Sequence, residues 1–238
     1  MHQPLQHRHL SSFWHIFTGM NLDHSWRSIH TIGKRTYLFI LLMQTCCRVV
    51  LTGGPGGGKT TAADLYRREI GESVVVVPEA ATLLYSGGFP RKGANGVRRA
   101  AQKAIYHVQT NLEDAQSAYY QSRVLICDRG TIDGAVYWPD ASPDFFESLG
   151  TSLEKELKRY DAVIFFETAA IGGISIEGGN PIRVESIEEA ITLDEKLKRL
   201  WSQHPHFVFV PHDPSFIKKI NTGLAELAKI VIKHQSEN

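Results

Sequence analysis

The chain has 238 residues, of which 42% are hydrophobic and 21% charged, and its formal net charge is +1. This composition suits one globular domain of ordinary size and excludes a highly charged disordered chain. The balanced charge lacks the basic excess of general nucleic-acid binders, so we expect no nucleic acid partner. The only cysteines are Cys46, Cys47 and Cys127, which excludes a disulfide framework and favours a reducing compartment such as the cytoplasm.

No segment predicts a membrane span. The longest strongly apolar run covers residues 37–43, far below the roughly 20 residues that a spanning helix requires. The run also begins too far along the chain for an ordinary secretory signal. Together with the cysteine usage, this predicts a cytoplasmic protein without a membrane span.

Residues 1–42 differ from the rest of the chain. Many of the histidines fall within this segment, and Asp23 is its only acidic residue. A metal-binding tract, an organelle transit peptide and a translation start at Met43 are three interpretations. We favour the start at Met43, because the pattern of regular strands begins just after it. We therefore expect 1–42 to be a disordered or untranslated tail and 43–238 to form the folded domain.

Strand and helix patterns alternate through the folded domain. Short apolar runs predict strands at 48–52, 73–77, 123–127, 162–166 and 207–210. Between and after them, the patterns predict helices at 60–70, 100–121, from 151, from 186 to about 201, and at 214–234. Two of these helices open with capping-box patterns, Thr151 with Glu154 and Ser186 with Glu189. Strands separated by helices predict an α/β fold in three layers, with a five-stranded parallel sheet covered on both faces.

The longest predicted helix, 100–121, has one apolar face. Its residues recur at helical spacing and predict the side that packs on the sheet. They are Ala104, Ile105, Val108, Leu112 and Ala115.

A glycine-rich loop carries the sharpest functional signal. Residues 53–60 read GGPGGGKT and match the phosphate-binding motif G-x-x-x-x-G-K-[ST], after a strand and before a helix. Glycines let backbone N–H groups curl around a phosphate, and the helix N-terminus adds a positive dipole end. Lys59 should reach the β- and γ-phosphates, and the Thr60 hydroxyl should bind Mg²⁺. The expected nucleotide-binding residues are Gly53, Gly54, Pro55, Gly56, Gly57, Gly58, Lys59, Thr60 and Thr61.

Charged residues follow two other predicted strands. Asp128 and Arg129 end the third strand, and Glu79 follows the second. Ligands of open α/β sheets bind at the carboxyl ends of the strands, so we expect all three beside the phosphate loop. Asp128 can hold Mg²⁺, Arg129 can contact phosphate oxygens, and Glu79 can accept the proton of an attacking hydroxyl. Asp133 is a weaker candidate for the acceptor site, equally consistent with a charge in the first turn of a helix.

Two glycine-rich segments add further candidates. Residues 172–183 follow the fourth strand, and a lid there would bring Arg183 to the transferring group; an ordinary flexible loop fits equally well. Residues 87–99 are rich in glycine and basic residues. They could clamp an anionic acceptor, although a solvated loop is the interpretation that we prefer.

Three segments together resemble a known family: residues 51–61 (LTGGPGGGKTT), 77–80 (VPEA) and 127–131 (CDRGT). They are similar to a P-loop family of AAA-labelled ATP-binding domains, which groups the ribosylnicotinamide kinase domain with a eukaryotic TRP-channel translocation-defect protein. The resemblance implies a kinase-like P-loop NTPase fold in which the Asp128 strand lies next to the phosphate-loop strand. It also implies MgATP as the donor, with Asp128 near the metal and Arg129 near phosphate or acceptor.

Two functions follow from this pattern. The first is an ATP-dependent kinase acting on a nucleoside- or nucleotide-like small molecule. The second is a nucleotide-dependent switch or ATPase, in which bound nucleotide orders 87–99 and 172–183 so that a protein or an anionic lipid docks. We favour the kinase, because a carboxylate beside the phosphate loop suits proton abstraction. Its expected catalytic residues are Lys59, Glu79, Asp128, Arg129 and Arg183, with Thr60 and Asp128 as metal ligands.

Overall fold

A five-stranded parallel sheet organises the part of the chain that the computed structural model describes, residues 46–139, 144–173 and 185–237. The strand order is β2-β3-β1-β4-β5, and all four neighbouring pairs are parallel. The strands are β1 (Arg48–Thr52), β2 (Val74–Val77), β3 (Val124–Asp128), β4 (Ala162–Phe166) and β5 (Phe207–Val210). This confirms the predicted α/β class, and it places the Asp128 strand directly beside the phosphate-loop strand.

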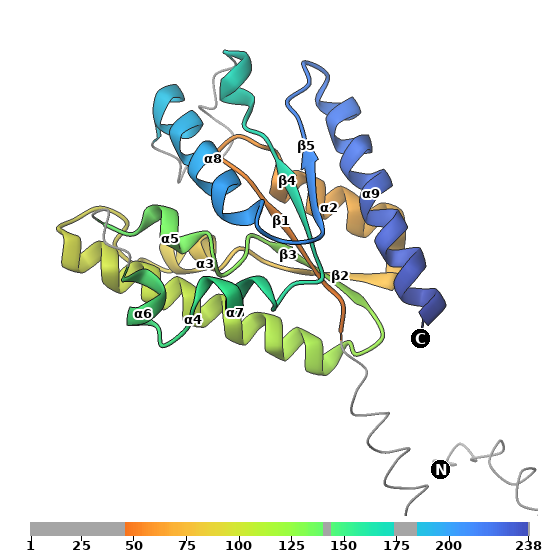
Figure 1. Cartoon of the computed structure of the whole chain (residues 1–238), viewed down its shortest axis with the longest axis horizontal. Coiled ribbons are helices and arrows are strands. Elements are labelled where there is room, and N and C mark those ends of the chain that lie inside the picture. Colours follow the sequence, from red (N-terminus) through yellow and green to blue (C-terminus); the bar gives the residue numbers. More distant parts are fainter. Residues whose placement is uncertain (1–45, 140–143, 174–184, 238) are drawn as a thin grey trace, which may run out of the picture. The chain divides into compact units, whose positions relative to one another are not determined.

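Helices cover both faces of this sheet (Figure 1). Helices α2 and α9 pack on one face, and α4 and α8 pack on the other, which gives three layers. The helices are α2 (Lys59–Ile70), α3 (Ala80–Ser86), α4 (Asn95–Tyr119), α5 (Gly134–Tyr137), α6 (Phe145–Ser148), α7 (Leu153–Leu157), α8 (Ile187–Trp201) and α9 (Phe216–Glu237), with 3₁₀ turns at Gly71–Ser73 and Ala169–Gly172.

The alternation of strand side chains divides the core into two clusters. Val49 and Leu51 of β1 face the α2 and α9 layer, whereas Val50 between them packs with Leu197 and Trp201 of α8. Strands β3 and β4 are buried at every residue. Continuous apolar runs are therefore required in these strands, because helices cover them on both sides.

One predicted capping box is confirmed and the other is wrong. Ser186 accepts a hydrogen bond from the Glu189 N–H, and the Glu189 side chain accepts one from the Ser186 N–H. At α7 the cap is Ser152, whose hydroxyl accepts from the Lys155 N–H. Thr151 instead donates its hydroxyl to Glu156, because that buried carboxylate needs donors.

Helix α4 differs from its prediction in its extent and in part of its buried face. It begins at Asn95, so the end of the basic segment 87–99 is helical. Its buried residues include Gln102, Gln109 and Glu113, whereas Ala115 of the predicted apolar face is exposed. Polar side chains face inward because they have buried hydrogen-bond partners, Ala80 after β2 and Tyr160 before β4.

Some predictions concern residues beyond the described ranges. They include the tail at 1–42 and most of the lid segment, among them Arg183. Within the described residues, no helix combines the length and apolarity needed to cross a membrane.

Candidate active site

The phosphate loop joins β1 to α2 in a conformation that depends on glycine. Gly53 has φ 132°, and a Cβ there would lie 2.0 Å from the carbonyl oxygen of Phe166. Gly58, the N-cap residue just before α2, has φ 88°, and a Cβ there would meet the Phe216 ring at 2.7 Å. Positive φ values and such close approaches exclude larger residues. The loop therefore lies at the carboxyl edge of the sheet with the N-terminus of α2 behind it, as the motif predicts.

Lys59 is buried within this loop. Its Nζ donates hydrogen bonds to the carbonyl oxygens of Gly53 (2.8 Å) and Gly54 (2.7 Å). Burial, with a smaller contribution from the Arg129 guanidinium, lowers the pKa of Lys59 to about 7. Negative charge brought next to the amine would favour its protonated form. The geometry thus suits a lysine that pairs with phosphate oxygens.

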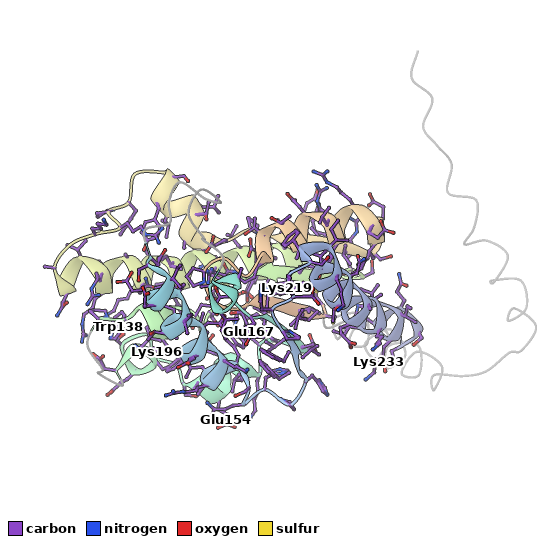
Figure 2. All side chains as sticks on the ribbon, turned by 90° about the horizontal axis from the view of Figure 1, so that it is seen from above. Trp138, Glu154, Glu167, Lys196, Lys219 and Lys233 are labelled. Atoms are coloured by element: carbon purple, nitrogen blue, oxygen red, sulfur yellow. The ribbon has the colours of Figure 1, made fainter. Side chains whose placement is uncertain are left out.

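Three side chains hold the loop in place and were missed in the sequence. Asp194 of α8 accepts hydrogen bonds from the backbone N–H groups of Gly54 (2.6 Å) and Thr168 (3.0 Å). The Thr168 hydroxyl donates to the carbonyl oxygen of Pro55. Lys219 of α9 donates to the carbonyl oxygens of Gly57 (3.0 Å) and Glu167 (2.5 Å), and Figure 2 labels both charged residues.

A sequence signal for two of these residues exists. Asp194 lies in phase with the buried residues Ala190, Leu197 and Trp201 of α8. Lys219 likewise lies four residues before the buried Gly223 of α9. A charged residue at a core position of an amphipathic helix must have buried partners, which predicts a structural or functional role.

Asp128 ends β3 and has an incompletely satisfied carboxylate. The side chain is buried beside the Thr60 side chain, and its Oδ1 has no hydrogen-bond partner among the described residues. Burial, and then the nearby Glu79, raise the pKa of Asp128. A buried anionic oxygen beside a hydroxyl fits a divalent cation, which would supply the missing partner.

The side chains at this site favour Mg²⁺ over a metal ion that protein ligands surround completely. The described part of the chain contains no group of three His, Cys, Asp or Glu side chains that could hold a metal. Mg²⁺ keeps several waters and is usually held by one or two protein ligands plus phosphate oxygens. Thr60 and Asp128 fit this mode of binding.

Glu79 and Arg129 form an ion pair beside the phosphate loop. Arg129 Nε lies 2.5 Å from Glu79 Oε1, and the Thr82 hydroxyl donates to Glu79 Oε2. Burial raises the pKa of Glu79, but Arg129, Thr82 and Lys59 together hold it below its ordinary value. Glu79 is therefore ionised at neutral pH and can accept a hydrogen bond from a hydroxyl group.

Arg129 is held in place by Asp133 as well. Arg129 has φ 71°, and its Nη1 lies 2.9 Å from Asp133 Oδ2. Asp133 also accepts hydrogen bonds from the Thr52 hydroxyl (2.8 Å) and Trp201 Nε1 (2.7 Å). Asp133 is only 4% exposed and three side chains donate to it, so it is better suited to positioning Arg129 than to accepting a substrate proton.

A cavity of about 240 Å³ extends from the phosphate loop along α4. Lys59, Thr60, Glu79 and Arg129 line one end. The remaining wall is rich in aromatic and amide side chains: Tyr85, Tyr106, Tyr137, Gln102 and Gln109.

Gln102 stands out in this wall. It is only 7% exposed, and its side chain forms no hydrogen bond with a described residue. A buried amide without a protein partner needs one, and here it lines a cavity that a ligand can enter. The nearby Arg91, which also lines the cavity, already pairs with Glu185 at 2.6 Å and lies over the Tyr85 ring.

The fold and the loop together define a P-loop nucleotide-binding protein. The loop follows β1, the central strand of the sheet. The chain places β2 and β3 on one side of β1 and then β4 and β5 on the other side. Open α/β sheets bind ligands at the strand where the direction changes in this way. A family model described as an AAA domain matches residues 48–215, and the chain belongs to this family. No curated protein matches the chain.

Solved kinase structures share this fold. Deoxyadenosine kinase from M. mycoides, solved with dATP bound, has a TM-score of 0.57 at 15% identity, over 76% of this chain and 99% of that chain. Thymidylate kinase from Candida albicans has a TM-score of 0.53 at 16% identity, over 80% and 94% of the two chains. Thymidylate kinase from Ehrlichia chaffeensis has a TM-score of 0.50 at 15% identity, over 79% and 99%. At these identities the likeness shows a kinase-like fold.

Proposed function

We propose that this protein transfers a phosphoryl group from MgATP to a hydroxyl group of a nucleoside-like small molecule. The observation that carries the proposal is the cavity that begins at the phosphate loop. Glu79 and Arg129 line it beside Lys59, and an aromatic and amide wall continues from them. A donor site and an acceptor site thus share one cavity, with a carboxylate where the acceptor hydroxyl would meet the transferred group.

The donor would be held by the phosphate loop and its neighbours. The residues from Gly56 to Thr61 would surround the phosphates with backbone N–H groups, since Pro55 has none and Asp194 accepts that of Gly54. Lys59 would contact the β- and γ-phosphates. Thr60 and Asp128 would hold Mg²⁺, which supplies charge stabilisation to the phosphate oxygens.

The acceptor end would position a hydroxyl rather than activate it strongly. Glu79 has a lowered pKa, so it is a weak base but a permanent hydrogen-bond acceptor. Phosphoryl transfer through a loose transition state requires little covalent help, so positioning and electrostatic stabilisation carry most of the rate. Arg129 would stabilise charge on the transferring group, and Arg183, outside the described residues, would join it from the lid segment.

The cavity chemistry supports a ring-bearing acceptor. Arg129 faces two carboxylates, and Arg91 pairs with Glu185. Arg98, which also lines the cavity, donates to the Asn95 side chain and has no carboxylate partner among the described residues, so it can contact an anionic group of the acceptor. Tyrosine rings offer stacking surfaces, and the Gln102 amide offers a donor and an acceptor to a polar ring edge. These groups support a nucleoside-like acceptor, with or without a phosphate group. The finer grouping with the ribosylnicotinamide kinase domain remains a prediction.

Glu79→Gln tests this proposal in the full chain. The variant keeps the shape of the side chain but removes its charge, so acceptor-dependent ADP release should fall by about 10- to 100-fold, as for the loss of one hydrogen bond to a charged group. The affinity for MgATP, measured by calorimetry, should change little. Glu72→Gln is the matched control, since Glu72 is exposed and pairs with Arg123 away from the cavity.

The same experiment separates the two functions. Slow ADP release that ignores every acceptor and is unchanged in Glu79→Gln would contradict the kinase and support the nucleotide-dependent switch. A loss of MgATP affinity equal to the loss of turnover would instead place Glu79 in nucleotide binding.

A further inference from the structure

A fully buried glutamate on α4 has no part in the chemistry proposed above. Glu113 is 0% exposed and accepts three hydrogen bonds. The donors are Gln109 Nε2 (3.1 Å), the Tyr160 hydroxyl (2.8 Å) and Arg159 Nη2 (3.0 Å). Burial raises the pKa of this carboxyl, although the three donors oppose the shift. A buried charged group is costly, and a protein with packed apolar residues in its place is often at least as stable. The presence of Glu113 and its three donors therefore needs an explanation.

Two of these donors lead to the loops that carry the ion pair. Gln109 Oε1 accepts the backbone N–H of Ala80 (3.2 Å), the residue after Glu79. The Tyr160 hydroxyl accepts the backbone N–H of Thr131 (2.8 Å), two residues after Arg129. Glu113 is therefore one side chain away from the backbone on each side of the pair.

The orientation of the intermediate groups makes these links directional. The Gln109 amide uses its oxygen for Ala80, so its nitrogen must find an acceptor, and Glu113 Oε1 is that acceptor. The Tyr160 oxygen receives the Thr131 N–H, so its own proton is free to be donated, and it goes to the same Oε1. One carboxylate oxygen thus fixes the hydrogen-bonding sense of both links.

Arg129 needs such support from its surroundings. Its backbone lies in the left-handed region at φ 71°, which is unfavourable for a residue with a side chain. A strained conformation persists only where neighbouring contacts determine it. The anchor at Thr131 lies immediately beyond the tightly packed Gly130, where a Cβ would lie 2.7 Å from the Trp201 ring.

We propose that Glu113 is a positioning residue that couples the Glu79 loop to the Arg129 loop through Gln109 and Tyr160. The coupling itself is independent of catalysis. Its consequence for turnover rests on the proposed function, because Glu79 and Arg129 would have to keep their contact while the acceptor hydroxyl and the phosphoryl group meet between them.

Amide hydrogen exchange of the full chain tests the coupling without any activity. Tyr160→Phe removes the acceptor of the Thr131 N–H, so exchange there should accelerate in any case. The coupling predicts that exchange at Ala80 also accelerates, by about 5- to 10-fold, as for the weakening of one buried hydrogen bond. In a Glu113→Gln background, Tyr160→Phe should have no further effect at Ala80.

Tyr66→Phe is the matched control for lost stability. The Tyr66 hydroxyl is buried and donates to the carbonyl oxygen of Ile220 in the other core cluster. This variant also loses a buried hydrogen bond, but it should leave exchange at Ala80 and Thr131 unchanged. If Tyr160→Phe accelerates Thr131 alone, or if Tyr66→Phe accelerates both amides equally, the coupling does not exist.

A kinetic measurement then links the coupling to the reaction. Tyr160→Phe should lower acceptor-dependent kcat about tenfold with the affinity for MgATP unchanged, whereas Tyr66→Phe should leave kcat unchanged. If amide exchange at Ala80 and Thr131 is coupled but the protein transfers no phosphoryl group, the proposed function is refuted and the inference about Glu113 stands. An active enzyme with uncoupled exchange would refute the inference about Glu113 alone.

Discussion

Two buried aspartates near the phosphate loop should respond in opposite directions to the same substitution. Asp128 has a carboxylate oxygen without a partner, whereas Asp133 accepts hydrogen bonds from Thr52, Arg129 and Trp201. Asp128→Asn removes a buried charge that lacks a full set of hydrogen-bond partners. Asp133→Asn removes a buried charge whose partners are all in place. The free energy of unfolding of the nucleotide-free protein should therefore rise in the first variant and fall in the second.

The expected sizes follow from these contacts. Relief of one poorly satisfied buried group should raise the free energy of unfolding by about 1 kcal/mol, or roughly 2–4 °C in Tm for a domain of this size. Loss of one partner from a buried ion pair costs about 3–5 kcal/mol, and in Asp133→Asn the new amide group would also face the donors of Arg129. Thermal unfolding and urea denaturation of the full chain measure both changes.

Nucleotide binding provides the second half of this test. MgATP at about 100 times its Kd should stabilise the wild-type protein by roughly 2.7 kcal/mol. In Asp128→Asn the magnesium-dependent part of this stabilisation should disappear, while the response to ATP with a chelator remains. If Asp128→Asn destabilises the free protein as Asp133→Asn does, or if it reduces both responses equally, Asp128 is a structural residue and the metal site is wrong.

Two further predictions concern buried lysines. Lys59 has a pKa of about 7, which a bound phosphate would raise. The protein should therefore take up close to one proton when it binds MgATP at pH 8, as measured by calorimetry in buffers of different ionisation enthalpy. Proton uptake that persists in Lys59→Met would show that Lys59 is not its source. Burial lowers the pKa of Lys219 to about 8, below its value in the unfolded chain. The unfolded state therefore binds more protons above pH 8, and the free energy of unfolding should gain up to about 1.4 kcal/mol per pH unit between pH 8 and about 10. Lys219→Met should lose this increment in urea titrations, and an unchanged pH slope would show that Lys219 does not cause it.

Local patterns in the sequence predicted the sheet and the phosphate loop well. Apolar runs of four or five residues identified the five strands, because β3 and β4 are buried on both faces. The positions of Glu79 and Asp128 at strand ends placed them at one edge of a parallel sheet. The strand pattern, and the rule that residues following parallel strands lie at one edge of the sheet, both depend on short stretches of chain. A single sequence shows such stretches directly.

Contacts between distant segments could not be predicted in this way. Asp194 reaches Gly54 across 140 residues, and Lys219 reaches Gly57 across 162 residues. The apolar spacing of α4 predicted only part of the buried face, because the buried partners of Gln109 and Glu113 lie on segments distant in the sequence. Such choices depend on which partners the fold brings together.

The most direct test of the proposed function is acceptor-dependent ADP release by the full chain with MgATP. The panel would contain pooled nucleosides, pooled nucleoside monophosphates and pooled sugar alcohols, each compared with MgATP alone. We predict that the nucleoside or the monophosphate pool increases ADP release more than the sugar alcohols do, and that Lys59→Ala abolishes the response. Release that is the same with every pool, or that persists in Lys59→Ala, would contradict a kinase built on this phosphate loop.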